Sequence, residues 1–176
     1  RFPGLLPDRA RVAADMARDH KDKDGVEILQ GMAISVWLSD PITGLHMINA
    51  MLRPTEEALA RSEAFQRDGF VDLGPVRVEV VGHVGMLYFR HTPFLNAEDD
   101  ETIHAQEVAA DLVLMHPALT MGLLRGDVVD HPRYAGRRVF SSGINLTRIY
   151  SGDISYLFFP VRELGFVHKL YRGLAE

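Results

Sequence analysis

One stretch of the chain combines a sharp turn with a backbone donor at its exit. The apolar, β-favouring pair Val139 and Phe140 leads into Ser141–Gly143, and Ile144 follows immediately. Glycine lets the chain turn sharply and lets a ligand approach the backbone, and polarised N–H groups at the start of a helix bind anions. The pattern predicts that Gly143 aims the amide of Ile144 at a developing negative charge, as one half of an oxyanion hole if the ligand is a thioester. An ordinary tight turn is the alternative.

Composition sets the broad class. The 176 residues are 47% hydrophobic and 24% charged, with a formal net charge of −5 and no cysteine. These values are typical of a globular protein with one substantial core, and they provide no basic field for nucleic acid, no disulfide and no thiolate metal site. No apolar run approaches the roughly 20 residues that span a bilayer. We expect a cytoplasmic protein that binds neither nucleic acid nor membrane.

Both ends of the chain raise an expectation about its completeness. The start, residues 1–7, has no initiator Met and lacks the long apolar stretch of a signal peptide. The last segment stops at Glu176, just after a helical pattern. We therefore expect part of a longer polypeptide.

Residues 1–75 are predicted to form a mostly helical N-terminal region. Val26–Leu38 is apolar almost all round, which indicates a buried helix or an assembly surface. Thr55 is placed to cap a helix that begins with two glutamates. The helices are expected over Asp8–His20, Val26–Ser39, Leu45–Leu52 and from Thr55 to about Asp68.

The pattern changes at Gly74–Pro75, where we place a domain boundary, so that residues 76–176 form an α/β region. Apolar and polar residues alternate through Val76–Val80, and Val84–Phe89 returns as the second strand of a hairpin. Asn96 is predicted to cap the next helix. The further elements are expected as a helix over Ala97–Met115, a strand over Leu119–Leu124, a loop over Gly126–Arg138 and a helix over Ile154–Tyr171, kinked at Pro160.

Several segments in one order carry a resemblance. They are Leu95–Asp99, Gly122–Gly126, His131–Leu146 with its Phe140-Ser-Ser-Gly-Ile-Asn-Leu146 motif, and Arg162–Lys169. Together with the helical residues 1–75, they resemble the crotonase (enoyl-CoA hydratase/isomerase) superfamily, and within it the cofactor-independent dioxygenases that act on (3,5-dihydroxyphenyl)acetyl-CoA. The resemblance implies the first half of a crotonase-like ββα spiral behind a helical extension. It covers only about half of the family's catalytic domain.

The resemblance also implies roles for particular residues. Gly143 and Ile144 would be catalytic, Glu98 and Arg162 would reach the two ring hydroxyls, and Leu146 would lie against the reacting carbon. Asn145 would belong to the same substrate site. The residues that would bind CoA are His131, Pro132, Arg133, Tyr134 and Ser142.

Ordinary explanations stay open for these residues. Glu98 is predicted in the first turn of a helix, where acidic residues are favoured anyway, and Arg162 has Glu163 beside it as a partner. The loop over His131–Tyr134 reads equally as a solvated surface loop, and Leu146 as a core residue.

Other chemistries find little support. The eight histidines include no i,i+4 pair, and Glu101 with His104 makes only one of the helical pairs that a di-iron bundle needs. Asp22–Gly25 has the Asp-x-Asp-Gly spacing of a calcium loop without its remaining ligands. Ser141 and Ser142 lack the surroundings of a nucleophile elbow. We expect no metal, and the resemblance implies no cofactor.

The resemblance implies an arylacetyl-CoA dioxygenase with dioxygen and a CoA thioester as its substrates. A hydratase or isomerase of the same fold and a non-catalytic assembly subunit are the alternatives. The second oxyanion donor of crotonases comes from a later glycine-rich turn, so a missing segment or a second chain must supply it. By analogy we expect a homo-oligomer, a trimer or hexamer.

Overall fold

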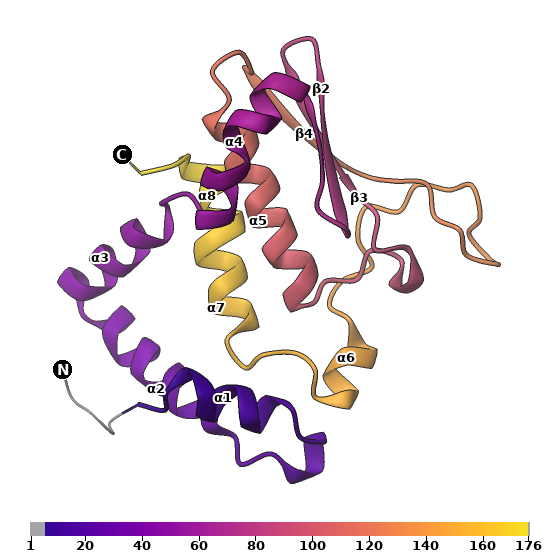
Figure 1. Cartoon of the computed structure of the whole chain (residues 1–176). Helices are drawn as coiled ribbons and strands as arrows, with labels where there is room; N and C mark the ends of the chain where they lie inside the picture. Colours follow the sequence, from indigo (N-terminus) through magenta and orange to yellow (C-terminus); the bar gives the residue numbers. More distant parts are fainter. Residues whose placement is uncertain (1–5, 176) are drawn as a thin grey trace.

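A computed structural model describes residues 6–175 of the chain, so the first residues of the predicted N-terminal region and Glu176 lie outside the described part. Four strands form one sheet in the order β1 (Phe70–Asp72), β2 (Val76–Val81), β3 (Val84–Phe89), β4 (Met121–Gly126). The first three strands are antiparallel to one another, and β4 runs parallel to β3. The structure is therefore a mixed α/β fold (Figure 1).

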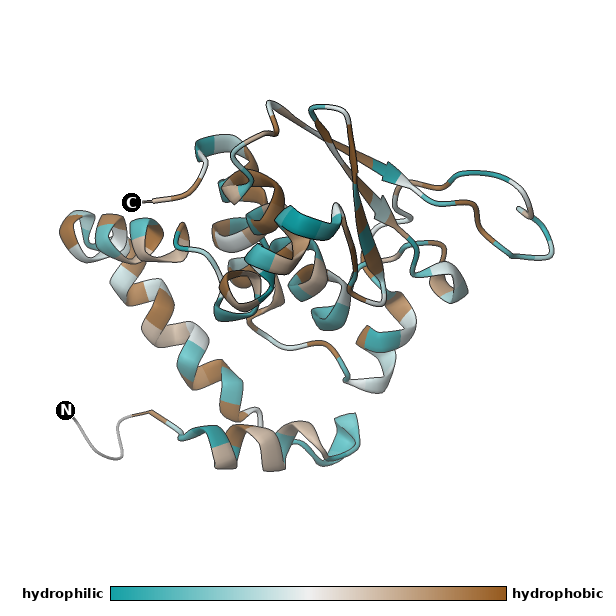
Figure 2. Cartoon of the chain, turned by 45° about the horizontal axis from the view of Figure 1, so that its top comes forward, coloured by the Kyte–Doolittle hydropathy of each residue, from teal (hydrophilic) through white to brown (hydrophobic). Residues whose placement is uncertain are grey.

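The core lies between the sheet and the helix α5 (Asp100–Met115), which crosses from β3 to β4 as parallel pairing requires. Val78 and Leu87 pair across β2 and β3 and are buried together with Leu112 of α5. In Figure 2 brown, apolar stretches mark both the strands and the helices packed beside them. The predicted hairpin is confirmed, because alternate side chains of each strand face this core.

The predicted cap of α5 is wrong. Asp99 caps the helix instead, because its carboxylate accepts the Thr102 N–H while the Thr102 hydroxyl accepts the Asp99 N–H. Asn96 lies in a left-handed turn at φ 58°. Its side-chain amide donates to the carbonyls of Phe89 and Val139, so it joins the end of β3 to the chain before Gly143.

The N-terminal helices form an arm beside the core. They are α1 (Arg9–Met16), the short 3₁₀ turn η1 (His20–Asp22), α2 (Val26–Ser39) and α3 (Pro41–Met51). In Figure 1 they run from the N-terminus along the side of the molecule away from the sheet. α1 is shorter than predicted, and α3 begins at Pro41, whose fixed φ suits a first helical position behind the capping Asp40.

α4 (Glu56–Asp68) matches its prediction and joins the arm to the core. Its Phe65 and Ala58 are buried in the same cluster as α5, and the unpredicted strand β1 follows directly and pairs with β2. Strand and helix on the N-terminal side of Gly74 thus pack with those after it. The division at residue 75 stays a prediction.

The last third of the chain differs most from expectation. After β4 comes a long loop that projects beyond the sheet in Figure 1. The helix α6 (Leu146–Ser151), which was not predicted, follows it. The predicted helix over Ile154–Tyr171 begins later. It consists of α7 (Phe158–Arg162), a π-helical turn η3 (Glu163–Val167) and α8 (His168–Arg172), so the irregularity follows Pro160 rather than lying at it.

Candidate active site

The backbone around Ile144 is held so that its amide points away from its neighbours. Glu98 and Ile144 form an isolated parallel bridge, in which the Glu98 N–H donates to Gly143 O (2.7 Å) and the Asn145 N–H donates to Glu98 O (2.8 Å). Because successive peptide groups of an extended chain alternate in direction, the Ile144 N–H faces the opposite side. It donates to no atom of residues 6–175. Gly143 makes this possible with a φ of 92°.

Ile144 lies at the border of two cavities. The larger has a volume of about 470 Å³ and reaches from Ile144 to the N-terminal arm. The smaller, of about 260 Å³, reaches from Ile144 toward Phe94 and His131. A backbone donor with no partner in the described chain therefore lies where two concave surfaces meet.

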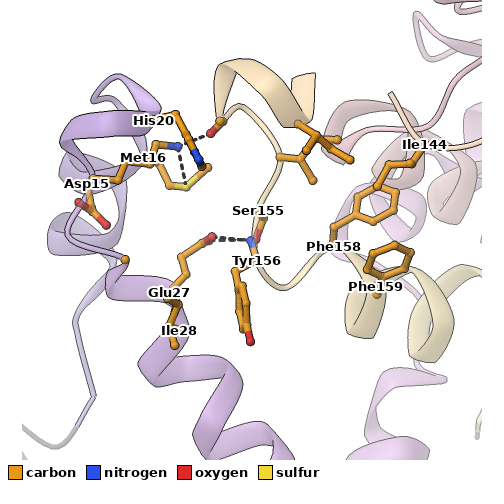
Figure 3. A pocket seen from close by; sticks show the side chains of 15 residues that line it. Asp15, Met16, His20, Glu27, Ile28, Ile144, Ser155, Tyr156, Phe158 and Phe159 are labelled. Carbon is orange, nitrogen blue, oxygen red and sulfur yellow. Dashed lines mark hydrogen bonds between the residues drawn. The ribbon is translucent and has the colours of Figure 1, made fainter. Parts of the chain in front are cut away.

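The arm and the core each contribute one wall of the larger cavity. Figure 3 shows Ile144, Phe158 and Phe159 on one side and Met16, His20 and Glu27 on the other. None of the arm residues was predicted for the site. Their contacts join residues more than 120 positions apart, which no local pattern in the sequence encodes.

Glu27 fastens the arm to the core. One of its carboxylate oxygens accepts the Ser155 hydroxyl (2.9 Å) and the other the Tyr156 N–H (2.8 Å), as the dashed lines in Figure 3 show. Asp100 accepts the Ser155 N–H from the core side (2.8 Å). Burial raises the pKa of Asp100, and the negative charges of Glu27 and Asp99 raise it further, against the lowering effect of that hydrogen bond.

Asp15 organises the arm itself. Its buried carboxylate accepts the N–H groups of Val26 (2.9 Å) and Asp24 (2.7 Å) at the start of α2. These backbone hydrogen bonds lower the pKa of Asp15, with a smaller contribution from Arg18. The charge of one carboxylate thus holds α1 against the beginning of α2.

Glu98 and Arg162 are brought together, although 64 positions separate them. The Arg162 guanidinium donates to both carboxylate oxygens of Glu98, at 2.6 and 3.3 Å. The same guanidinium contacts Glu163, the partner considered from the sequence. Hydrogen bonding to Glu98 raises the pKa of Arg162. Glu98 precedes α5 rather than lying in its first turn, and neither side chain lines the two cavities.

Asn145 and Leu146 occupy different environments. The Asn145 side chain is buried, donates to Asp99 (3.1 Å) and accepts the Arg148 N–H as the cap of α6. Leu146 is 72% exposed, so its reading as a core residue is wrong. Both residues line the smaller cavity.

Only part of the predicted CoA-binding set gathers at this site. His131 and Ser142 line the smaller cavity beside Ile144. Pro132, Arg133 and Tyr134 continue into the projecting loop, where the Arg133 guanidinium lies 5.5 Å from the Tyr134 ring centroid. The loop holds its own side chains together without placing these three in either cavity.

Residues 6–175 contain no group of three His, Asp or Glu side chains arranged to hold a metal ion. No helix in this range combines the length and apolar character needed to cross a bilayer.

The chain is similar to a known dioxygenase. It is 45% identical over 175 residues, 99% of its length, to (3,5-dihydroxyphenyl)acetyl-CoA 1,2-dioxygenase of Amycolatopsis orientalis, and it spans 40% of that protein. The resemblance expected from the sequence motifs is thereby confirmed for two fifths of the relative.

Two further comparisons do not identify a family. No family model matches the chain. A solved structure, the Pseudomonas aeruginosa protein PA4980, aligns with 57% of this chain and 41% of its own at a TM-score of 0.47 and 23% identity.

Proposed function

We propose that this chain is the part of an arylacetyl-CoA dioxygenase that stabilises a thioester enolate, on the first half of a crotonase-like spiral. The observation that carries the proposal is that the Ile144 N–H has no partner in residues 6–175, while Ile144 itself lines both cavities. A donor of this kind, fixed before the reaction, stabilises negative charge as it develops on a thioester oxygen.

The two cavities suit the two ends of such a substrate. The larger, with Ile144, Phe158 and Phe159 on its core wall, would take the apolar aryl group. The smaller, with His131 and Ser142, would take the thioester end of CoA. The thioester carbonyl would then lie at Ile144, and Leu146 would border it from the smaller cavity.

Glu98 and Arg162 remain our proposed contacts for the ring hydroxyls, since a carboxylate accepts from a phenol and a guanidinium donates to one. Support comes from the dihydroxyphenyl group in the name of the similar dioxygenase. The two side chains are paired with each other and line neither cavity, so a hydroxyl would contact the pair only if the bound ring extends beyond the larger cavity.

The reaction balances without an added reductant. Loss of one α-proton gives the enolate, which passes electrons to dioxygen and forms a carbon–oxygen bond at the α-carbon. The resulting peroxide attacks the thioester carbonyl and expels CoA as its thiolate. Loss of the second α-proton with cleavage of the O–O bond leaves a 2-oxo acid that holds both oxygen atoms, and the two protons end on CoA and the acid.

The rest of the machinery belongs to the proposal as well. We propose that a segment beyond these 176 residues, on the same polypeptide or a second chain, supplies the second oxyanion donor, as the greater length of the relative suggests. We also propose a homo-oligomer and catalysis without metal or flavin.

An oxygen-electrode assay tests the function. The complete gene product is supplied with (3,5-dihydroxyphenyl)acetyl-CoA, and oxygen uptake is compared with release of free CoA thiol. The expected result is one molecule of dioxygen consumed per molecule of CoA released. Hydration of an enoyl-CoA without oxygen uptake would assign the protein to the hydratases instead, and turnover of neither thioester would favour an assembly subunit.

A further inference from the structure

Two ion-paired levels join α5 to the last helices of the chain. At one level Arg162 pairs with Glu98, just before α5, and at the other Lys169 pairs with Glu107 (2.7 Å) and Asp111 (2.9 Å) within α5. Along the chain Glu98 precedes Glu107, and Arg162 precedes Lys169. Since the earlier residues pair with each other and the later residues pair with each other, the two helical segments run in the same direction, as Figure 1 shows. The two sets of ion pairs, called the clamp below, therefore hold α5 and the last helical segment together at two points along their length.

The Lys169 level is the more deeply buried. Lys169 and Asp111 are completely buried, and only 13% of the Glu107 side chain is exposed. Buried charges are tolerated only when paired, so each of these side chains holds the others in place. Asp111 also accepts the Thr55 N–H at the cap of α4 (2.7 Å), which ties a third helix to the cluster.

Gly165 is required for this arrangement. A Cβ atom at this position would lie 2.9 Å from the carboxylate of Glu107. Any larger residue would push that carboxylate away from Lys169. The cluster thus depends on one glycine inside the π-helical turn that separates Lys169 from Arg162.

The π-helical turn η3 sets how Arg162 is directed relative to Lys169. In an α-helix, residues seven apart lie within about 20° of one another around the axis. The wider π turn, with hydrogen bonds that span five residues, removes that alignment, and such turns are frequent at functional sites. With Lys169 fixed, the turn directs Arg162 to Glu98.

Glu98 connects this clamp to the site. Its side chain is held by Arg162, while its backbone N–H and C=O hold Gly143 and Asn145 on either side of Ile144. A displacement of Glu98 would therefore rotate the peptide group of Ile144.

We propose that Lys169, with Glu107 and Asp111, is a positioning residue: acting through η3 and the Arg162–Glu98 pair, it fixes the orientation of the Ile144 peptide group beside the two cavities. The inference rests on the proposed function for its consequence in catalysis. The geometry that it asserts does not depend on the identity of the substrate.

An NMR experiment tests the geometry directly in the complete gene product. Isoleucine is labelled with ¹⁵N, and the Ile144 amide signal is identified by its loss in Ile144→Val. We expect Lys169→Met to shift this signal in the same direction as Arg162→Met, while Ile28 and Ile42 of the arm stay unchanged. The matched control Lys21→Met, an exposed lysine, leaves all of them in place. A folded Lys169→Met protein with an unmoved Ile144 signal would overturn the proposal.

A second variant covers the case in which Lys169→Met does not fold. Gly165→Ala keeps every charge and adds one methyl group against Glu107. It should move the Ile144 signal in the same direction by a smaller amount. An unchanged signal in this variant would equally contradict the positioning role.

Kinetics test the consequence. Exchange of the substrate α-protons with deuterated water reports enolate formation without the oxygen step. Misplacement of reacting groups by a remote change costs up to about 100-fold, so we expect Lys169→Met to lower the exchange rate about 10- to 100-fold with KM nearly unchanged. In the double variant with Arg162→Met the loss should be no larger than for Arg162→Met alone, whereas multiplied losses would show independent roles. A wild-type protein that neither exchanges these protons nor consumes oxygen would refute the proposed function, and the NMR result would still decide the positioning role.

Discussion

The arm of α1–α3 and the core around α5 are both rich in apolar residues, yet they are held in place by different forces. Ten residues of α5 are buried, whereas Val26 is the one buried residue of α2 among those described. Met32 and Val36 of α2 are more than 60% exposed. Lys23 and Glu27 fasten the arm to Gly152 and Ser155, whereas Asp15 holds the arm together by accepting the Val26 N–H.

The larger cavity lies between these two regions, so its two walls differ in kind. One wall contains Ile144 and the buried Phe158, and the other contains His20 and Glu27 of the arm. Regions with few buried apolar contacts open locally at low free-energy cost. We therefore expect the core wall to hold its geometry while the arm wall opens.

Matched leucine truncations should show the largest difference. Leu112 on α5 is 1% exposed and Leu45 on α3 is 61% exposed. Leu112→Ala should lower the free energy of unfolding by about 2–5 kcal/mol, because it leaves a cavity in the core. Leu45→Ala should change it by less than about 0.5 kcal/mol. Chemical denaturation measures both, and equal losses would show that α3 is packed as tightly as α5.

Loss of the Glu27 connection should open the arm without unfolding the core. Glu27→Gln removes a charged acceptor from Ser155 and Tyr156, and such hydrogen bonds contribute about 1.5–3 kcal/mol. Hydrogen exchange in α1 and α2 should rise about 10-fold or more while exchange in α5 stays constant. Glu56→Gln, an exposed glutamate of α4, is the control. Faster exchange in α5 would mean that the two regions unfold together.

Acid should loosen the arm internally before the core unfolds. Because backbone hydrogen bonds lower the pKa of Asp15, its stabilising contribution is complete above about pH 4, the ordinary aspartate value, and is lost as the pH falls through the lower folded-state pKa. Fluorescence anisotropy of Trp37, the single tryptophan and part of α2, should decrease over that range. In Asp15→Asn this pH dependence should disappear; its persistence would point to another group.

Asp100 should respond to pH in the opposite direction and more weakly. Burial raises its pKa, so its charged form costs stability as the pH rises from about 4 through the raised folded-state value. Asp100→Asn keeps an acceptor for the Ser155 N–H and removes the charge. The melting temperature near pH 7 should rise slightly, with no change below pH 4. A lower melting temperature at pH 7 would show that the charge stabilises the helix start instead.

The contrast between regular, locally encoded elements and irregular ones explains which parts of the fold could be predicted from the sequence. The hairpin and α5 follow from regular apolar spacing and a core on one side, and the turn at Gly143 follows from its glycine. β1 is too short for an alternating pattern, and the π turn after Arg162 keeps the appearance of a helix. Asn96 and Asp99 are both good caps, and the deciding contact, a hydroxyl three positions later, favours Asp99.

The site was predictable only where it is local. The turn at Ile144 could be predicted because it is contained in a few residues, and the role of Ile144 stays a prediction. The pairing of Glu98 with Arg162 and the wall formed by Met16 and His20 depend on distant parts of the chain meeting in space. These contacts are visible in the folded structure but cannot be inferred from the spacing of residues in the sequence.

The decisive test concerns the amide hydrogen of a single residue. Ile144→Pro removes the donor, and Ile144→Val keeps it with nearly the same side chain. Exchange of the α-protons of (3,5-dihydroxyphenyl)acetyl-CoA with deuterated water, followed by NMR, should slow about 100- to 1000-fold in the proline variant and stay close to wild type in the valine variant. Equal exchange rates in a folded proline variant would show that the enolate is stabilised elsewhere.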